Sequence, residues 1–95
     1  MLPCERPLEI AWSLNTLAHE SYHLAGVRNE ARTECYALQA IDFVARRLGA
    51  TAGQARALAA FSFDQLPSRM PSLYSSPECH DGGMYDLRPG SAVWP

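Results

Sequence analysis

Prolines divide this sequence into parts of different character. Of the seven prolines in the 95-residue chain, two precede residue 8 and five follow residue 66. Proline has no amide hydrogen to donate and disrupts the interior of helices and sheets, so its density shows where long regular elements can form. We therefore expect the long elements between residues 8 and 66, after an extended lead-in at residues 1–7.

Apolar residues recur at helical spacing in the central part of the chain. The pattern predicts three helices, at residues 8–24, 30–48 and 52–66. The first is expected to carry one apolar stripe of Ile10, Leu14, Leu17 and Leu24, beside a second of Leu8, Trp12, Thr16, His19 and His23. The buried stripe of the second is expected to be Ala31, Cys35, Leu38, Ile41 or Asp42, Ala45 and Leu48.

Residues with known positional preferences stand where these helices should begin and end. Gly26 and Gly49 can end the first two helices, because glycine adopts a left-handed backbone at little cost. Asn29 suits the N-cap of the second helix. Thr51 and Gln54 match a capping box at the start of the third. The fold expected is mainly α, with the first two helices forming an antiparallel hairpin around Gly26.

The segment 67–95 differs in composition from the helical part. Its five prolines and three glycines exclude long regular elements. It also holds several large apolar side chains, namely Leu73, Tyr74, Met84, Tyr85, Leu87, Val93 and Trp94. A disordered segment would have few such residues, so we expect an irregular but ordered tail lying over the helices within a single domain.

Composition and charge exclude several classes of partner. The formal net charge is −2, and all eight basic residues are arginines that form no basic run. Nucleic acid is therefore not an expected partner. The longest apolar-leaning run, residues 10–17, is far short of the roughly 20 residues of a membrane span. We find no secretory signal pattern and no repeat, and the compartment is not determined.

Three cysteines, Cys4, Cys35 and Cys79, lack the short paired spacings of a zinc ribbon or a redox motif. One disulfide with one free thiol and three free thiols are both compatible with this count. Cys35 lies on the second predicted helix, where it suits a small buried residue or a disulfide partner of Cys4 or Cys79.

His19, Glu20 and His23 form the pattern HExxH near the end of the first predicted helix. Residues four apart on a helix lie one above the other, so both imidazoles can share one metal ion. Glu20 lies one step round the helix, where its carboxylate can reach a water on the metal and act as a general base. This pattern predicts a zinc site.

Two further acids follow at the start of the second predicted helix. Glu30 and Glu34 lie one turn apart on one face. In a tight hairpin the start of the second helix lies beside the end of the first, so these acids are expected next to the histidines. They can supply a third ligand and a hydrogen-bond partner for a ligating imidazole.

The pattern of His19, Glu20 and His23, followed by Glu30, Thr33 and Glu34, resembles that of the gluzincin metallopeptidases. The resemblance covers about residues 16–40. It implies zinc as the cofactor, with His19, His23 and Glu30 as its ligands and Glu20 as the catalytic base. It further implies that Glu34 orients His19, and that the substrate is a peptide or protein. Only six residues separate His23 from Glu30, so the hairpin should be tight.

Peptidases of this type usually hold the substrate along a strand that precedes the active-site helix, whereas this chain begins at the helix. We therefore expect that the tail forms the wall of the substrate cleft, that another chain completes the cleft, or that the protein has lost activity. His80, Tyr85 and Tyr74 are candidate donors to the transition state, although a surface loop for His80 and packing for the tyrosines are simpler interpretations.

Three alternatives remain open at this point. HExxH followed by Gly26 also matches the start of the metzincin pattern, with Asn29 at the third-ligand position and Met84 as a Met-turn, but Asn is a poor zinc donor. A non-catalytic binding module could use zinc structurally, with a fourth ligand such as His80. A metal-free interaction protein is the third alternative.

Overall fold

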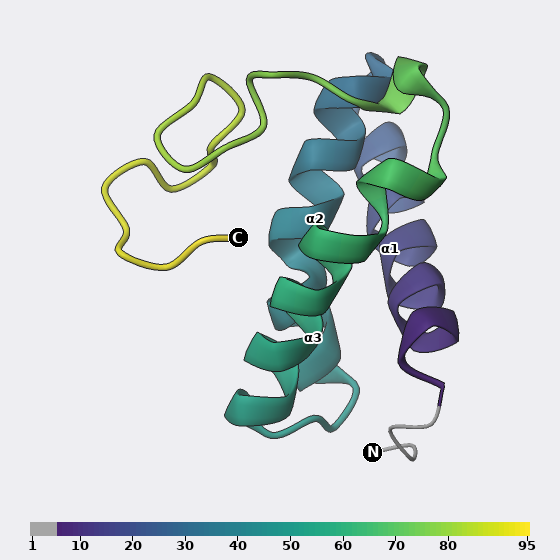
Figure 1. Cartoon of the computed structure of the whole chain (residues 1–95), viewed down its shortest axis with the longest axis vertical. Helices are drawn as coiled ribbons and strands as arrows, with labels where there is room; N and C mark the ends of the chain where they lie inside the picture. The colour runs from purple at the N-terminus through teal and green to yellow at the C-terminus, as the bar shows by residue number, and fades with distance from the viewer. Residues whose placement is uncertain (1–5) are drawn as a thin grey trace.

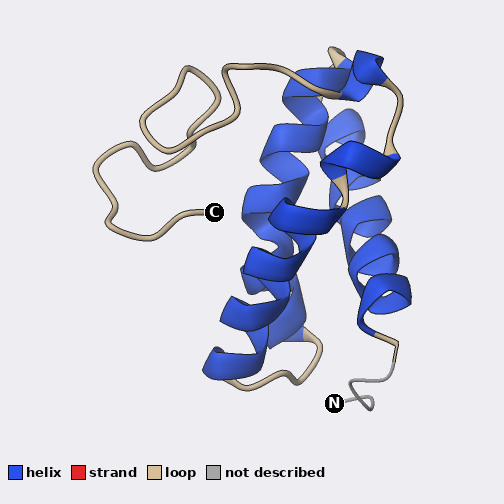
Figure 2. Cartoon of the chain, in the orientation of Figure 1, coloured by secondary structure: helices blue, strands red, loops and turns tan. Residues whose placement is uncertain are grey.

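The computed structural model of the chain describes residues 6–95, and its long elements are three helices (Figure 1). They are α1 (Pro7–Leu24), α2 (Glu30–Arg47) and α3 (Ala52–Gln65). Helix α2 packs against both α1 and α3, and the remaining described residues form loops and two short 3-10 turns, η1 (Pro67–Arg69) and η2 (Ser72–Tyr74) (Figure 2). The mainly α fold with a hairpin, a third helix and an irregular tail is confirmed. The expected lead-in falls mostly on residues 1–5, outside the described residues.

The helix ends follow from the residues that occupy them. Gly26 and Gly49 both have φ of +106°, the left-handed conformation that ends α1 and α2. The Asn29 side chain accepts a hydrogen bond from the amide of Arg32 at 2.9 Å and caps α2. The predicted capping box at the start of α3 is present, with both reciprocal bonds formed. Local sequence signals therefore fix the length of each helix.

The core lies between the three helices and consists largely of small and aliphatic residues. Its buried members are Ala11, Leu14, Leu38, Ile41, Ala45, Ala55, Leu58, Ala59 and Leu66. Alanines on all three helices let the backbones approach closely, and the larger side chains fill the space between them. The core joins the first half of α1 to α2 from Leu38 onward, and the candidate site lies beyond it, at the end of α1 and the start of α2.

The stripe predicted for α1 is partly wrong, because Leu17 is 52% exposed and Leu24 is 91% exposed. The buried face of α1 is instead formed by Ala11, Leu14, Asn15, Ala18 and His19. Polar Asn15 and His19 can occupy it because they pair with a buried carboxylate of α2. Leu48, predicted for the buried stripe of α2, is 68% exposed. Over residues 6–95 no helix has the length and apolarity needed to cross a bilayer.

The tail is attached to α2 and α3 at several points. Cys79 forms a disulfide with Cys35 of α2, one of the pairings that the sequence left open, while Cys4 lies outside the described residues. The buried Gln39 side chain donates to the Tyr85 carbonyl at 2.8 Å and accepts from the amide of Leu87 at 2.7 Å. The Trp94 ring packs edge-on against Phe63 of α3. The tail is thus irregular but fixed to the helices.

Candidate metal centre

Three donor atoms from the end of α1 and the start of α2 converge. Nε2 of His19 lies 3.0 Å from Nε2 of His23, and Oε1 of Glu30 lies 3.1 Å from the first and 2.7 Å from the second. The i, i+4 spacing places both imidazoles on one face of α1, and the tight connection through Gly26 returns the chain so that Glu30 meets them. The predicted ligand set is therefore one cluster in space.

The other ring nitrogen of each histidine, Nδ1, lies within hydrogen-bonding distance of an oxygen. Nδ1 of His23 lies 2.7 Å from the Val27 carbonyl, which can only accept, so this nitrogen carries the hydrogen. Nδ1 of His19 lies 2.9 Å from Oε1 of Glu34, which also accepts from the Asn15 amide at 3.2 Å. With its hydrogen on Nδ1, each imidazole can turn an Nε2 lone pair toward a metal ion, and an Nε2 that carries a proton can instead donate it to the Glu30 carboxylate. A metal ion or a proton placed between the two Nε2 atoms and the Glu30 oxygen would satisfy all three.

The electrostatics of the cluster follow from these contacts. The hydrogen bond to the Val27 carbonyl, together with Glu30, raises the pKa of His23 despite some desolvation. Burial alone would raise the pKa of Glu30, but hydrogen bonds from His19 and His23 hold it below its usual value. Burial raises the pKa of Glu34, against the opposing bonds from His19 and Asn15. The cluster therefore favours a positive charge at its centre and a negative charge on Glu30.

Glu20 lies at the exposed edge of the same cluster. Its carboxylate and the two imidazoles each offer an atom within 4.8 Å of the others, an arrangement that could hold a metal ion. Glu30 makes the shorter contacts with the imidazoles, whereas Glu20 has none in hydrogen-bonding range among the described residues. Glu20 thus lies beside the two imidazoles without a hydrogen bond to them.

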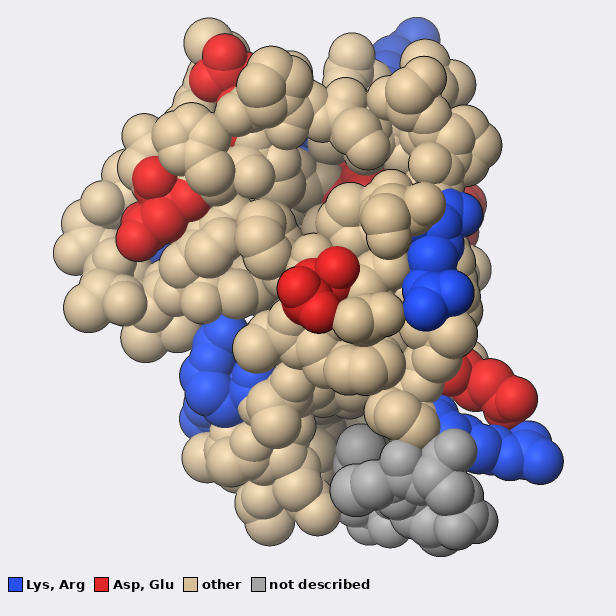
Figure 3. Space-filling view, in the orientation of Figure 1, with Lys and Arg blue, Asp and Glu red and all other residues tan. Residues whose placement is uncertain are grey.

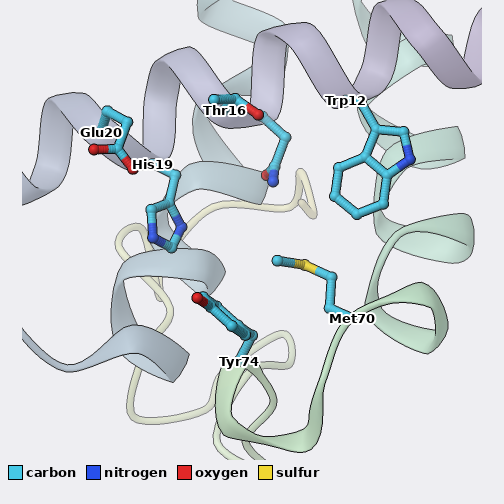
Figure 4. A pocket seen from close by; sticks show the side chains of 7 residues that line it. Trp12, Thr16, His19, Glu20, Met70 and Tyr74 are labelled. Carbon is cyan, nitrogen blue, oxygen red and sulfur yellow. The ribbon is translucent and has the colours of Figure 1, made fainter.

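A pocket of about 170 Å³ opens beside His19 and Glu20 (Figure 4). Its other wall comes from the segment after α3, which contributes Met70 and Tyr74, and Trp12 of α1 closes one end. The Tyr74 ring centroid lies 5.8 Å from that of His19. The start of the tail therefore lies opposite His19 and Glu20 across this pocket, whose lining does not include His23 or Glu30.

The other candidate donors lie elsewhere. His80 is exposed in a turn, with Nδ1 donating to the Asp81 carbonyl at 3.0 Å, and it does not line the pocket. Tyr85 packs edge-on against Tyr36 and lines a different pocket with Arg32 and Met84. Of the tyrosines considered, only Tyr74 faces the cluster.

Asn29, the third-ligand position of the metzincin alternative, serves as the N-cap of α2. Its side chain caps α2, and Met84 is 75% exposed in the pocket beside Tyr85. Neither residue joins the histidines as the metzincin pattern would require. This arrangement argues against that alternative.

Sequence reasoning missed two groups at the centre. Asn15 is 2% exposed and donates to Glu34, and the Val27 carbonyl orients His23. Asn15 lies one turn before His19 on the same face of α1, so the i, i+4 spacing could have identified it. The backbone contact of Val27 depends on the exact path of the turn, for which the sequence has no side-chain signal.

Comparison of the chain with protein-family models, with characterised proteins and with solved structures found no match. We therefore infer a function from the geometry and chemistry of the cluster.

Proposed function

We propose that the chain binds one zinc ion through His19, His23 and Glu30 and hydrolyses peptide bonds. The observation that supports this proposal is the convergence of two Nε2 lone pairs and one carboxylate oxygen within 3.1 Å of one another. Two imidazoles and a carboxylate are a donor set typical of catalytic zinc.

The donor separations suit the size of the ion. Zinc bound tetrahedrally at the usual bond lengths has ligand atoms about 3.3 Å apart. The observed separations are 2.7 to 3.1 Å, so each donor would move by only a few tenths of an ångström. Three protein ligands also leave one position of a tetrahedral site open to water or substrate, as catalysis requires.

Zinc, when bound, would supply a Lewis acid that polarises a carbonyl group and lowers the pKa of a coordinated water. Glu20 would take a proton from the attacking water on a carboxylate oxygen and return it to the leaving amine. The Tyr74 hydroxyl, on the opposite wall, would donate a hydrogen bond to the oxygen of the scissile carbonyl. Trp12 and Met70 would contact an apolar side chain of the substrate.

A second function is favoured by the position of Glu20. Because its carboxylate lies within 4.8 Å of both imidazole donors, Glu20 could become a fourth ligand. A site closed by four protein ligands would be structural, bracing the α1–α2 hairpin of a non-catalytic binding module. No strand in residues 6–95 offers an edge to an extended peptide, which also suits this alternative.

The variants Glu20→Gln and Glu30→Gln separate the two functions when zinc content and peptide hydrolysis are both measured. For the peptidase, Glu20→Gln keeps about one zinc per chain and loses hydrolysis by 100-fold or more, as expected for a general base, while Glu30→Gln loses zinc as well. For the structural site, both variants lose zinc and the wild type has no activity. Glu9→Gln, an exposed acid on α1, is the control that should change neither. A wild type that binds no zinc would refute both functions.

A further inference from the structure

A second pocket, of about 260 Å³, lies where the tail meets α2 and α3. It is lined by three arginines from three different elements: Arg46 of α2, Arg56 of α3 and Arg88 of the tail. The only acidic residue in its lining is Asp42. Figure 3 shows basic side chains gathered just below the tail, beside the lower part of the helices.

Contacts within the protein hold these guanidinium groups in place. The Asp42 carboxylate accepts from both Arg46 and Arg56, the latter at 2.7 Å. Arg56 also donates to the main-chain oxygen of Pro95 at 2.9 Å, and Arg88 donates to the Gln39 carbonyl at 3.4 Å. A guanidinium has five N–H donors, so each arginine keeps donors for a further partner.

The charge of the pocket is opposite in sign to that of the whole chain. Three arginines against one aspartate give a local formal charge of +2, whereas the chain has a net charge of −2. The Arg46 and Arg56 side chains are 50% and 33% exposed, so the positive groups are accessible at the mouth of the pocket. Such a concave surface with a net positive charge concentrates anions.

We propose that this pocket binds a phosphate group, either as the free anion or as a monoester. One bidentate guanidinium satisfies a planar carboxylate, whereas three guanidiniums approaching from three elements suit the several oxygens of a tetrahedral anion. Phe43 and Val93 line the same pocket, and their exposed side chains offer an apolar surface to the organic part of a monoester. The site is independent of the proposed zinc centre, whose residues do not line it.

Titration of the full chain with inorganic phosphate and with phenyl phosphate, followed by NMR at the arginine Nε–H groups, tests this site. Saturable shifts are expected at Arg46, Arg56 and Arg88, with none for chloride at equal ionic strength. Arg88→Gln should weaken phosphate binding at least tenfold. Arg46→Gln should do the same, and it serves as the second variant if the first affects the tail. Arg69→Gln, outside the pocket and hydrogen-bonded to Gln65, is the control and should change affinity less than twofold.

The two sources of phosphate give different results in this experiment. Tighter binding of phenyl phosphate than of inorganic phosphate indicates a monoester ligand, and equal binding indicates the free anion. Either result supports the site. Shifts that do not saturate, or equal affinities in Arg88→Gln, Arg46→Gln and Arg69→Gln, would overturn the proposal.

Discussion

Oε1 of Glu34 accepts a hydrogen bond from Nδ1 of His19 at 2.9 Å, and this bond determines which nitrogen of the imidazole faces the cluster. Glu34 is only 2% exposed, and its Oε2 has no hydrogen-bond partner among the described residues. A buried carboxylate with an unpaired oxygen is costly, which agrees with its raised pKa. The position of Glu34 is therefore better explained by the orientation that it gives the His19 ring than by stability.

The variant Glu34→Gln should weaken metal binding more than it weakens folding. The amide keeps the shape of the side chain but removes its charge, and loss of the carboxylate partner of a metal-binding imidazole typically costs about 10- to 100-fold in metal affinity. Competition with a chelator gives the affinity, and urea denaturation gives the free energy of unfolding. Glu9→Gln is the matched control, because that side chain is 69% exposed. Unchanged metal affinity in Glu34→Gln would contradict this role.

Sequence patterns predicted both ends of each of the three helices to within one residue because the signals are local. Proline, glycine and the capping residues Asn29 and Thr51 act within a turn or two of their own position. The proximity of His19, His23 and Glu30 followed from the same signals, since helical spacing and a short hairpin bring them together. These features needed no information from distant parts of the chain.

Features that depend on distant contacts could not be predicted in this way. Asn15 is buried because Glu34 of α2 supplies a partner for its amide, and hydrophobic periodicity does not include that effect. The choice of Tyr74 rather than Tyr85 as the residue facing His19 depends on the path of the tail. That path is set by the Cys35–Cys79 disulfide and by the hydrogen bonds of Gln39 with Tyr85 and Leu87. Each of these contacts joins residues that are more than 40 positions apart in the sequence.

The Cys35–Cys79 disulfide should contribute substantially to stability. It closes a loop with a sequence separation of 44, for which chain entropy predicts roughly 4 kcal/mol. We expect the double variant Cys35→Ala/Cys79→Ala to lose a free energy of unfolding of this order in urea denaturation. Wild-type protein under reducing conditions should show a similar loss. If the oxidised and reduced proteins unfold at the same urea concentration, the disulfide does not stabilise the fold.

The loop around Asp86 should loosen in acid. The amide of Gly82 donates to Oδ2 of Asp86 and the amide of Arg88 donates to Oδ1, both at 2.8 Å. The bond from Gly82, followed by that from Arg88, lowers the pKa of Asp86 below its ordinary value of 3.8. A carboxylate whose pKa is lower in the folded chain than in the unfolded chain stabilises the folded loop. This stabilisation is complete at a pH above the unfolded pKa, and it is lost as the pH falls through the folded pKa.

Amide chemical shifts of Gly82 and Arg88 measured during an acid titration should therefore change with a midpoint below pH 3.8. In Asp86→Asn, which has no titrating carboxylate at this position, the transition should be absent from both amides. A midpoint above the ordinary value, or a transition that persists in the variant, would show that Asp86 does not hold the loop.

Two glycines of the tail should respond differently to the same substitution. A Cβ at Gly83 would overlap the main-chain oxygen of Glu78 and lie 2.8 Å from Nε2 of His80, whereas a Cβ at Gly90 meets nothing within 4 Å. The His80 side chain is exposed and can move, but the Glu78 oxygen belongs to the backbone and accepts from the amide of Tyr85 at 3.4 Å. Gly83→Ala should therefore force this turn apart.

We expect Gly83→Ala to lower the free energy of unfolding by about 1 to 3 kcal/mol, the usual cost of overpacking. Gly90→Ala should be neutral or stabilising by up to about 1 kcal/mol, because alanine restricts the unfolded chain without a clash in the folded one. Urea denaturation of both variants with the disulfide intact measures the difference. Because the two substitutions change the composition identically, equal stabilities would mean that the turn from Glu78 to Gly83 is not closely packed.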